Sequence, residues 1–236
     1  MKQLSRYFAF ALLLLPLWSN SQGLPSLTGA GRQHDIETWL ERNKLRSFNE
    51  NDDTLGDRFL YEEWKTGSVE TTDSLKVDKI ELKYDLLFDA LIGKIRGSMT
   101  TLRKENIRNF TVIDNGKKLH FQTVYHNDRM LFLQIIYTGT SINLYKQHSV
   151  RLEEKDAGNQ AYGSGVAYDK YVYKEEFFIE RGESGLTSIN NSKGAILKLL
   201  ADKKEEIKDY IKRESLNVKE EQDLGLVLKY YESIKN

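Results

Sequence analysis

Cysteine is absent from the 236 residues of this chain, and its absence excludes several kinds of protein. There can be no disulfide framework, no thiolate metal site, no cysteine nucleophile and no lipid attached through an N-terminal cysteine. Small secreted domains often depend on disulfides because their hydrophobic cores are small. A chain of this length can bury enough apolar surface to fold without them.

The sequence also lacks an excess of charge of either sign, since 35 basic residues stand against 35 acidic ones. Binding to nucleic acid requires a basic field, so no nucleic-acid partner is expected. Proline is scarce, with two residues, whereas 11% of the chain is aromatic. Such a composition is typical of a folded protein rather than a disordered one.

One long apolar run lies at the start of the chain. Lys2 and Arg6 make the beginning basic, and the apolar run covers residues 7–18. This is the layout of a secretory signal peptide. The run is about a dozen residues long, short of the ~20 that a membrane-spanning helix needs, so a retained anchor is disfavoured.

The small residues Ser19 and Ser21 fit the small-x-small rule for signal cleavage. We therefore expect a signal peptide over residues 1–21 that is removed near Ser21/Gln22. The mature protein would be soluble and either secreted or periplasmic, and it would keep no integral membrane segment.

Residues 22–57 are interpreted as a leader that contains one short helix. The first part of this leader is small, polar and rich in glycine. Asp35 suits a helix N-cap, and the apolar residues Ile36 and Trp39 follow at helical spacing. Residues 58–236 contain no tandem repeat or linker, which indicates a single β-rich domain.

Alternating polarity predicts β-sheet from Arg58 to about Glu180. In one segment charged residues separate a regular apolar set: Ile80, Leu82, Tyr84 and Leu86. This period of two is typical of an antiparallel strand with one solvated face. The pair Asn115-Gly116 predicts a type I′ hairpin, because both turn positions need a positive φ. Residues 130–137 are apolar on both parities, which predicts a central strand covered on both faces.

Other strands are expected at 59–64, 67–72, 90–95, 98–102, 142–152 and 169–180. After Gly185 the period returns to 3.6 and predicts amphipathic helices over 192–213 and 218–234. The expected fold class is α+β, mainly β. An antiparallel meander would form a sandwich or a partly open barrel, with a C-terminal helical hairpin packed on it.

Familiar catalytic and cofactor motifs are missing from the sequence. It contains no G-x-S-x-G, G-x-x-x-x-G-K or G-x-G-x-x-G pattern. The four histidines, His34, His120, His126 and His148, show no metal-ligand spacing. His148 shares the apolar parity of Leu144 and Val150, which indicates a hydrogen-bonded residue on an inner face. No catalytic residue, metal site or cofactor is assigned.

Aromatic residues offer the best candidate binding surface. Tyr168, Tyr171 and Tyr173 crowd one segment, and tyrosines on a solvated sheet face can stack on sugars or anchor a protein partner. Aromatic residues are also good strand formers, so core or cross-strand pairing is the alternative interpretation.

Four segments carry a resemblance: FLYEEWKTGSV, KIELKYDLLFDALIG, ENIRNFTVI and KEEIKDYIKRESLNVKEEQDLGLVLKYYESI. Their order resembles that of uncharacterised exported proteins of Bacteroidetes-type Gram-negative bacteria. The resemblance covers about residues 58–236. It implies a periplasmic or extracellular setting, and it implies no reaction and no site residues.

Three functional hypotheses follow from these observations. The first is a non-enzymatic binding or envelope-associated module whose partner is a protein or a glycan. The second is a small hydrolase of unfamiliar type that acts on glycans through acids such as Glu81, Asp85 or Glu175. The third is a carrier of a hydrophobic ligand, as closed β-barrels often are.

Overall fold

The computed structural model describes residues 44–47, 56–153 and 169–235. The expected signal peptide, the short helix that begins at Asp35, and Tyr168 all lie outside the described residues.

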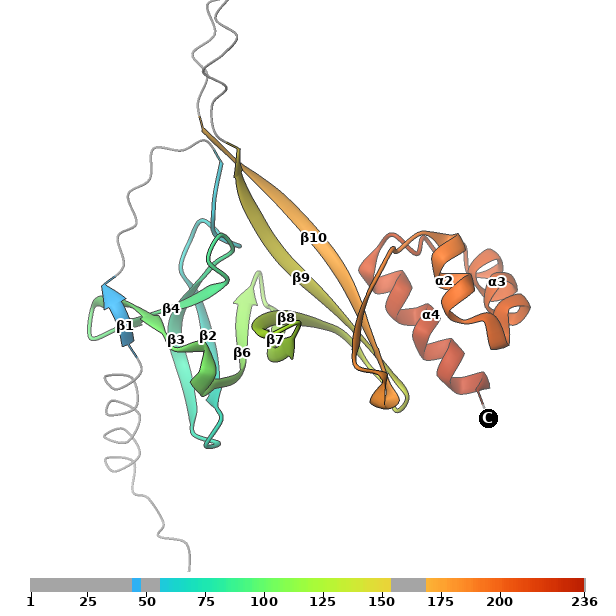
Figure 1. Ribbon diagram of the computed structural model, residues 1–236, viewed down its shortest axis with the longest axis horizontal. Helices are drawn as coiled ribbons and strands as arrows, with labels where there is room; N and C mark the ends of the chain where they lie inside the picture. Colours follow the sequence, from blue (N-terminus) through green and yellow to red (C-terminus); the bar gives the residue numbers. More distant parts are fainter. Residues whose placement is uncertain (1–43, 48–55, 154–168, 236) are drawn as a thin grey trace, which may run out of the picture.

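The described chain is mainly β, with helices near its C-terminal end (Figure 1). The strands are β1 (Lys44–Ser47), β2 (Lys65–Thr71), β3 (Lys76–Asp85), β4 (Ala90–Ile95), β5 (Ser98–Leu102), β6 (Ile107–Asp114), β7 (Lys117–His126), β8 (Arg129–Thr138), β9 (Ile142–Glu153), β10 (Lys170–Arg181) and β11 (Leu186–Ile189). The helices are α2 (Lys193–Leu199), α3 (Lys204–Arg213) and α4 (Glu221–Ile234), with 3-10 turns η1 (Lys104–Asn106), η2 (Gly182–Ser184) and η3 (Ala201–Lys203). The expected α+β, mainly β class is confirmed.

All paired strands are antiparallel, and they form one open sheet in the order β1-β5-β4-β3-β2-β6-β7-β8-β9-β10-β11. Strands β2 to β5 form one meander and β6 to β11 form a second. The two meanders join where β2 pairs with β6, with Val69 opposite Phe110. At this junction Gly67 has no room for a side chain, because a Cβ would overlap the carbonyl oxygen of Thr111.

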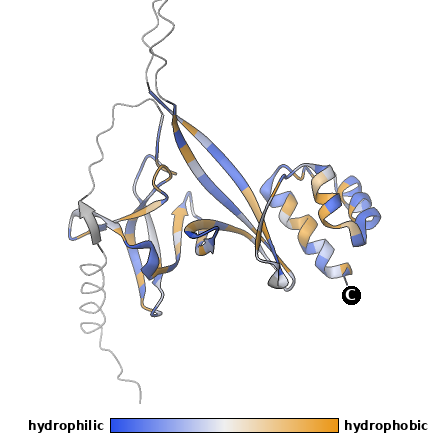
Figure 2. Ribbon diagram, viewed as in Figure 1, coloured by the Kyte–Doolittle hydropathy of each residue, from blue (hydrophilic) through white to orange (hydrophobic). Residues whose placement is uncertain are grey.

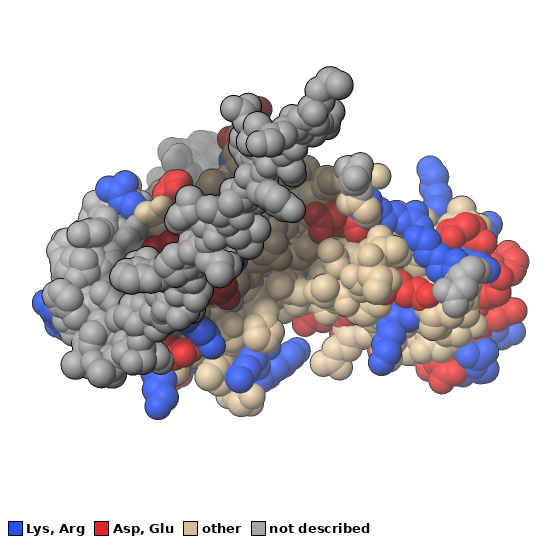
Figure 3. All heavy atoms as spheres, turned by 90° about the horizontal axis from the view of Figure 1, so that it is seen from below, with Lys and Arg blue, Asp and Glu red and all other residues tan. Residues whose placement is uncertain are grey.

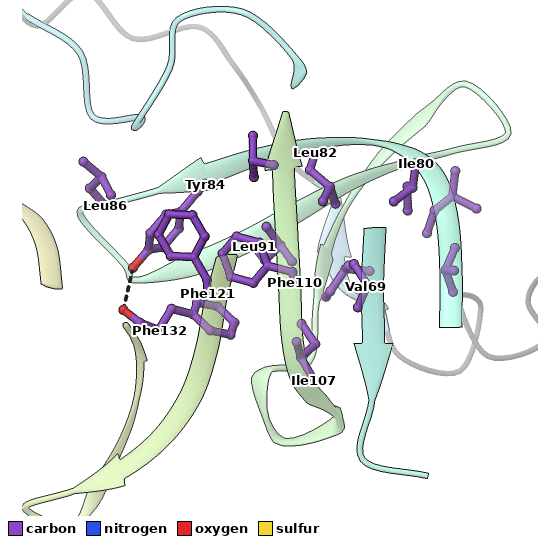
Figure 4. Packing of buried hydrophobic residues seen from close by; sticks show 14 of the residues in the cluster. Val69, Ile80, Leu82, Tyr84, Leu86, Leu91, Ile107, Phe110, Phe121 and Phe132 are labelled. Carbon is purple, nitrogen blue, oxygen red and sulfur yellow. Dashed lines mark hydrogen bonds between the residues drawn. The ribbon is translucent and has the colours of Figure 1, made fainter. Parts of the chain in front are cut away.

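The sheet curls until its two meanders approach each other again. The backbone N–H of Val150 in β9 lies 3.5 Å from the carbonyl oxygen of Leu86, just after β3. The hydroxyl of Tyr84 in β3 lies 3.4 Å from the carbonyl oxygen of Phe132 in β8 (Figure 4). The paired strands therefore form one curled, open antiparallel sheet whose two meanders meet through these contacts.

Aromatic rings fill the concave side of the curl (Figure 4). Phe110 and Phe121 stack with their centroids 4.6 Å apart. Tyr84 and Phe132 meet this pair edge to face, at 5.7 Å and 5.0 Å from Phe110. None of the four is more than 2% exposed. The alternating apolar residues of the sequence therefore form a separate hydrophobic core.

A second core forms where the helices cover one end of β9 and β10 (Figures 1 and 2). In Figure 2 polar and apolar residues alternate along both strands, and apolar residues recur along α4. Ile142 and Leu144 of β9 pack there with Val227 and Tyr231 of α4. The expected packing of the C-terminal helices on the sheet is therefore confirmed.

The helix expected over 192–213 is divided in two in the structure. Leu200 leaves the helical region with φ −103° and ψ 40°, which ends α2 before α3 begins. The guanidinium of Arg181 in β10 donates to the carbonyl oxygen of Leu199 over 3.0 Å. This tertiary hydrogen bond satisfies the Leu199 carbonyl, which would accept from a backbone N–H of the next turn if the helix were continuous. The bend lets both α2 and α3 reach the second core.

The sequence predicted the turn at Asn115-Gly116 correctly, but the strand that it predicted over 59–64 was wrong. Asn115 and Gly116 have φ values of 48° and 79°, so the predicted hairpin between β6 and β7 is confirmed. Residues 59–64 form no strand, and only an isolated bridge joins Phe59 to Asp85. Residues 44–47, beyond the expected short helix, form an edge strand against β5.

Candidate functional site

A polar stripe crosses the inner face of the sheet between the two cores. Gln134 of β8 lies opposite Lys146 of β9, and His148 of β9 lies opposite Glu175 of β10. These positions have the same parity as the apolar residues on either side of them, so their side chains share one face. Gln134, Lys146 and His148 are all buried.

A chain of hydrogen bonds links the stripe. The imidazole of His148 contacts the amide oxygen of Gln134 over 2.6 Å through Nε2, and the hydroxyl of Tyr173 through Nδ1. The Tyr173 hydroxyl donates to Oε1 of Glu175 over 2.8 Å. The same carboxylate oxygen accepts from Lys146 Nζ over 2.9 Å. The expectation that His148 is a hydrogen-bonded inner-face residue is confirmed.

Lys146 connects the polar stripe of the sheet to helix α4. Its Nζ lies 3.1 Å from Oε2 of Glu221, the first residue of α4, and 2.9 Å from Oε1 of Glu175. One buried ammonium group is thus held between two carboxylates from elements 46 residues apart in the sequence. The pair with Glu221 fixes the beginning of α4 over the sheet.

Burial and charge set the protonation states of the stripe. Burial, and then the charge of Lys146, lower the pKa of His148 to about 4, so the imidazole is neutral at pH 7. Burial, and then the hydrogen bond to Glu175, raise the pKa of Tyr173, which keeps its proton. Burial alone would raise the pKa of Glu175, but hydrogen bonds from Lys146 and Tyr173 outweigh it and hold the pKa below its usual value.

A cleft of about 270 Å³ opens beside this stripe, between the sheet and α4. Its walls come from the start of β7, the middle of β8 and the first turns of α4: Lys117, Lys118, Leu119, Gln134, Ile135, Ile136, Glu221, Gln222 and Gly225. A second hollow adjoins the other side of the stripe, where Glu175 meets the segment after β11. The ion pair between Lys146 and Glu221 therefore has a cavity on the Glu221 side and another on the Glu175 side.

Gly225 keeps the cleft open from the helix side. A Cβ built at this position meets no atom within 4 Å. Glycine inside a helix costs about 1 kcal/mol relative to alanine, and close packing does not account for its presence here. The missing side chain leaves space that any larger residue would occupy.

The structure separates the tyrosines that the sequence placed together. Tyr171 is partly buried and packs against the first core, as the cross-strand interpretation expected. Tyr173 is 49% exposed and belongs to the polar stripe. Tyr168 lies outside the described residues. A binding role for these tyrosines stays a prediction.

The acids named for a hydrolase bind three different cations. Glu81 lies 3.4 Å from Lys94, and Asp85 lies 3.0 Å from Arg58. Glu175 pairs with Lys146 in the stripe. Two of the other histidines make local contacts: His120 with Thr111, and His126 with Asn127. Within the described residues, His, Asp and Glu form no group of three or more that could hold a metal ion.

Sequence reasoning missed most residues of the cleft. Gln134 interrupts an apolar run, and Lys146 occupies the apolar parity of β9, so both carry a signal of buried polarity. Nothing in the sequence shows that Lys146 meets Glu221, because that contact depends on how α4 packs. Gly225 also carried no signal in the sequence, because its role depends on the empty space beside it in the folded chain.

Comparisons with known proteins give no relative for this chain: no protein-family model, no curated protein and no solved structure matches it. Among the residues that the structure describes, no helix is both long enough and apolar enough to span a bilayer. Seen from below, positive and negative side chains are mixed over the helical end of the molecule (Figure 3).

Proposed function

We propose that this chain is an exported, non-enzymatic binding module, and that its ligand site is the cleft between β7, β8 and α4. The observation that carries the proposal is the position of Gly225: a helix wall without a side chain faces a cleft that is also lined by Gln134 and Glu221, two members of the polar network. Binding sites combine a concave, partly apolar surface with a few fixed polar groups, and this cleft has both.

The polar stripe favours a binding role over a catalytic one, because its polar groups already bond to one another. Both ring nitrogens of His148 have partners, so neither is left to take a proton from a substrate. The raised pKa of Tyr173 keeps its hydroxyl in the protonated form. Such a network holds its side chains in one geometry, and this rigidity favours recognition of a ligand.

The carrier hypothesis has less support from the concave side of the sheet. The concave side of the curl is filled by the rings of Tyr84, Phe110, Phe121 and Phe132, each no more than 2% exposed. A hydrophobic ligand would need to displace them. The cleft outside this core is the better place for a small ligand.

The binding experiment compares the unmodified chain with two glycine variants in a fragment screen followed by NMR of ¹⁵N-labelled protein. Gly225→Leu fills the cleft, while Gly194→Leu adds the same side chain at an exposed position of α2 where a Cβ also meets no atom within 4 Å. We expect fragments that bind the unmodified chain and the Gly194 variant and that lose binding to the Gly225 variant. If every fragment that binds is indifferent to Gly225→Leu, the cleft is not the ligand site.

Export rests on the apolar run over residues 7–18 and the small residues that follow it. Expression of the full chain in a Gram-negative host, followed by N-terminal sequencing of the product outside the cytoplasm, tests this part of the proposal. A mature chain that begins at or next to Gln22 is expected. An uncleaved chain retained in the cytoplasm would contradict export without bearing on the cleft.

A further inference from the structure

We propose that the cleft takes a small primary amine in its protonated form, on a short apolar body, and that the ammonium group donates to Glu221 and to the amide oxygen of Gln134. This inference rests on the proposed function and names the chemistry of its ligand. Two acceptors without donors, an uneven balance of charge and an apolar wall support it.

The protonation of His148 decides which end of the Gln134 amide meets it. Burial and Lys146 lower the pKa of His148 to about 4, so at pH 7 the ring is neutral and donates through one nitrogen only. The Tyr173 hydroxyl donates to Glu175 over 2.8 Å, and it therefore cannot also donate to His148. Nδ1 of His148 then donates to the hydroxyl oxygen, which leaves Nε2 as an acceptor.

An accepting Nε2 requires the NH₂ group of Gln134 beside it. The amide oxygen lies 2.6 Å from Nε2, and a half-turn of the amide exchanges the oxygen and the NH₂ group without changing the shape of the side chain. After this turn the NH₂ group donates to His148, and the carbonyl oxygen lies at the opposite end of the amide.

Gln134 thereby offers a buried acceptor to the cleft. The residue is 5% exposed and lines the cleft. His148 is its side-chain hydrogen-bond partner, and no other group in the described part of the chain donates to the amide. A buried acceptor without a donor is unfavourable, and a ligand in the cleft can supply the donor.

Glu221 supplies the second acceptor, and its charge is only partly balanced. Its Oε2 lies 3.1 Å from Lys146 Nζ, but no group is placed to donate a hydrogen bond to that buried oxygen. Lys146 also donates to Glu175 over 2.9 Å, so two carboxylates share one ammonium group. The Glu221 side chain is 28% exposed and lines the cleft, where a second cation can reach it.

The neighbouring acids of α4 add to the uneven balance. Asp223 accepts from the backbone N–H of Asn217 over 2.7 Å, and Glu220 lies 3.5 Å from the Asn217 side-chain amide. Both acids thus contact uncharged groups. Together with Glu221 they outweigh the positive end of the helix dipole, which amounts to about half a charge. A cation is therefore the favoured ligand at this end of the cleft.

Two lysines at the mouth of the cleft oppose a cation, but they act weakly. Lys117 and Lys118 line the cleft and are both exposed. Long lysine side chains keep their ammonium groups in water, where solvent and salt screen their charge. Gln134 and Glu221 act at hydrogen-bond distance in a less solvated place, so they decide which ligand binds.

The apolar wall sets the size of the ligand body. Leu119, Ile135 and Ile136 form one side of the cleft. The volume of about 270 Å³ is just below the usual ~300 to 1,000 Å³ of ligand pockets. It suits a short alkyl amine rather than a sterol or a diacyl lipid.

The test uses four probes with the same alkyl chain: hexylammonium, hexanol, hexyltrimethylammonium and hexanoate. Hexanol keeps a donor without the charge, and hexyltrimethylammonium keeps the charge without an N–H donor. Each is titrated at pH 7 into the full ¹⁵N-labelled chain up to about 10 mM, above the ~1 mM dissociation constant of a weak fragment. We expect hexylammonium to bind about tenfold more tightly than the others, with shifts at Gln134 and the start of α4.

Removal of one charge provides the matched variants. Glu221→Gln keeps the shape of the side chain and is expected to weaken hexylammonium binding about tenfold or more. Glu206→Gln, the same change at an exposed position of α3, leaves binding unchanged. Lys117→Gln removes an opposing charge and should not weaken binding. The comparison of the four probes on the unmodified chain decides the ligand even if Glu221→Gln does not fold.

Several results would overturn the amine ligand. One is binding of any other probe as tight as that of hexylammonium, and another is the absence of hexylammonium binding. Binding indifferent to Glu221→Gln, or weakened by Lys117→Gln, would also overturn it. Each of these results leaves the binding module standing, because the fragment screen against Gly225→Leu decides the proposed function separately.

Discussion

Glu232 of α4 and Gly139 of the turn between β8 and β9 occupy one shared space, since a Cβ on residue 139 would overlap the Glu232 carboxylate. The carboxylate accepts from the backbone N–H groups of Ser141 and Ile142 over 2.6 Å and 3.2 Å. It also accepts from the hydroxyl of Tyr137 over 2.9 Å. The C-terminal end of α4 is thus fastened to the sheet by one side chain, as its beginning is by the Lys146 pair.

Gly139→Ala should destabilise the protein. The added methyl group displaces the Glu232 carboxylate from its donors, and each hydrogen bond lost in this way costs about 0.5 to 1.5 kcal/mol. Chemical denaturation measures the change in the free energy of unfolding. Gly194→Ala is the control, because its Cβ meets open space and alanine is the better helix former. An unchanged midpoint for Gly139→Ala would show that the turn and Glu232 can separate at no cost.

The Glu232 carboxylate should make stability depend on acid pH. Backbone hydrogen bonds from Ser141 and Thr140 and the Tyr137 hydroxyl outweigh burial and lower its pKa from 4.5 to about 2. A lowered folded-state pKa gives stability that is present above pH 4.5 and is lost as the pH falls toward 2. Unfolding free energies of the unmodified chain and of Glu232→Gln should therefore converge over that range. Curves of unfolding free energy against pH that stay parallel would contradict the lowered pKa of Glu232.

His148 should make a second contribution to the pH dependence of stability, at a higher pH than Glu232. Its pKa falls from 6.5 when unfolded to about 4 when folded, because burial and Lys146 disfavour the imidazolium. The unfolded chain then binds more protons between these values, so stability is present above pH 6.5 and is lost as the pH falls toward 4. We expect His148→Gln to flatten this part of the curve. NMR titration of the His148 ring reads the folded pKa directly, and a value near 6.5 would contradict the prediction.

Lys146→Met should loosen α4 from the sheet. The change leaves the carboxylates of Glu175 and Glu221 without their shared cation, and breaking a buried pair costs about 3 to 5 kcal/mol, less where the carboxylates are partly exposed as here. Adding Glu221→Gln should recover part of the loss, because it removes one stranded charge. Urea unfolding of the two single variants and the double variant measures the coupling. Additive losses would show that Lys146 and Glu221 do not interact.

The sequence predicted the elements that depend on neighbours along the chain. The Asn115-Gly116 hairpin follows from the two positive φ values that a type I′ turn needs, and this requirement is local. Strands β4 and β5 began and ended where alternation and turn residues placed them. The helical period after Gly185 likewise located the C-terminal helices.

Features that depend on distant contacts could not be predicted. Pairing of β2 with β6 joins two meanders, and either could have paired elsewhere without changing its own pattern. The bend at Leu200 depends on Arg181, which comes from β10. The cleft is assembled from three elements, and its composition of lysine, glutamine and glycine has no spacing that marks a site.

The meeting of Leu86 with Val150 has a dynamic consequence. One backbone N–H···O contact of 3.5 Å joins β9 to Leu86 there, whereas β9 and β10 share a full ladder of hydrogen bonds. Because this backbone contact is long and has no ladder beside it, it can open locally while the Tyr84–Phe132 contact and the aromatic core still hold the two meanders together. The Val150 amide should therefore exchange its hydrogen for deuterium earlier than the Phe110 amide in the middle of the sheet.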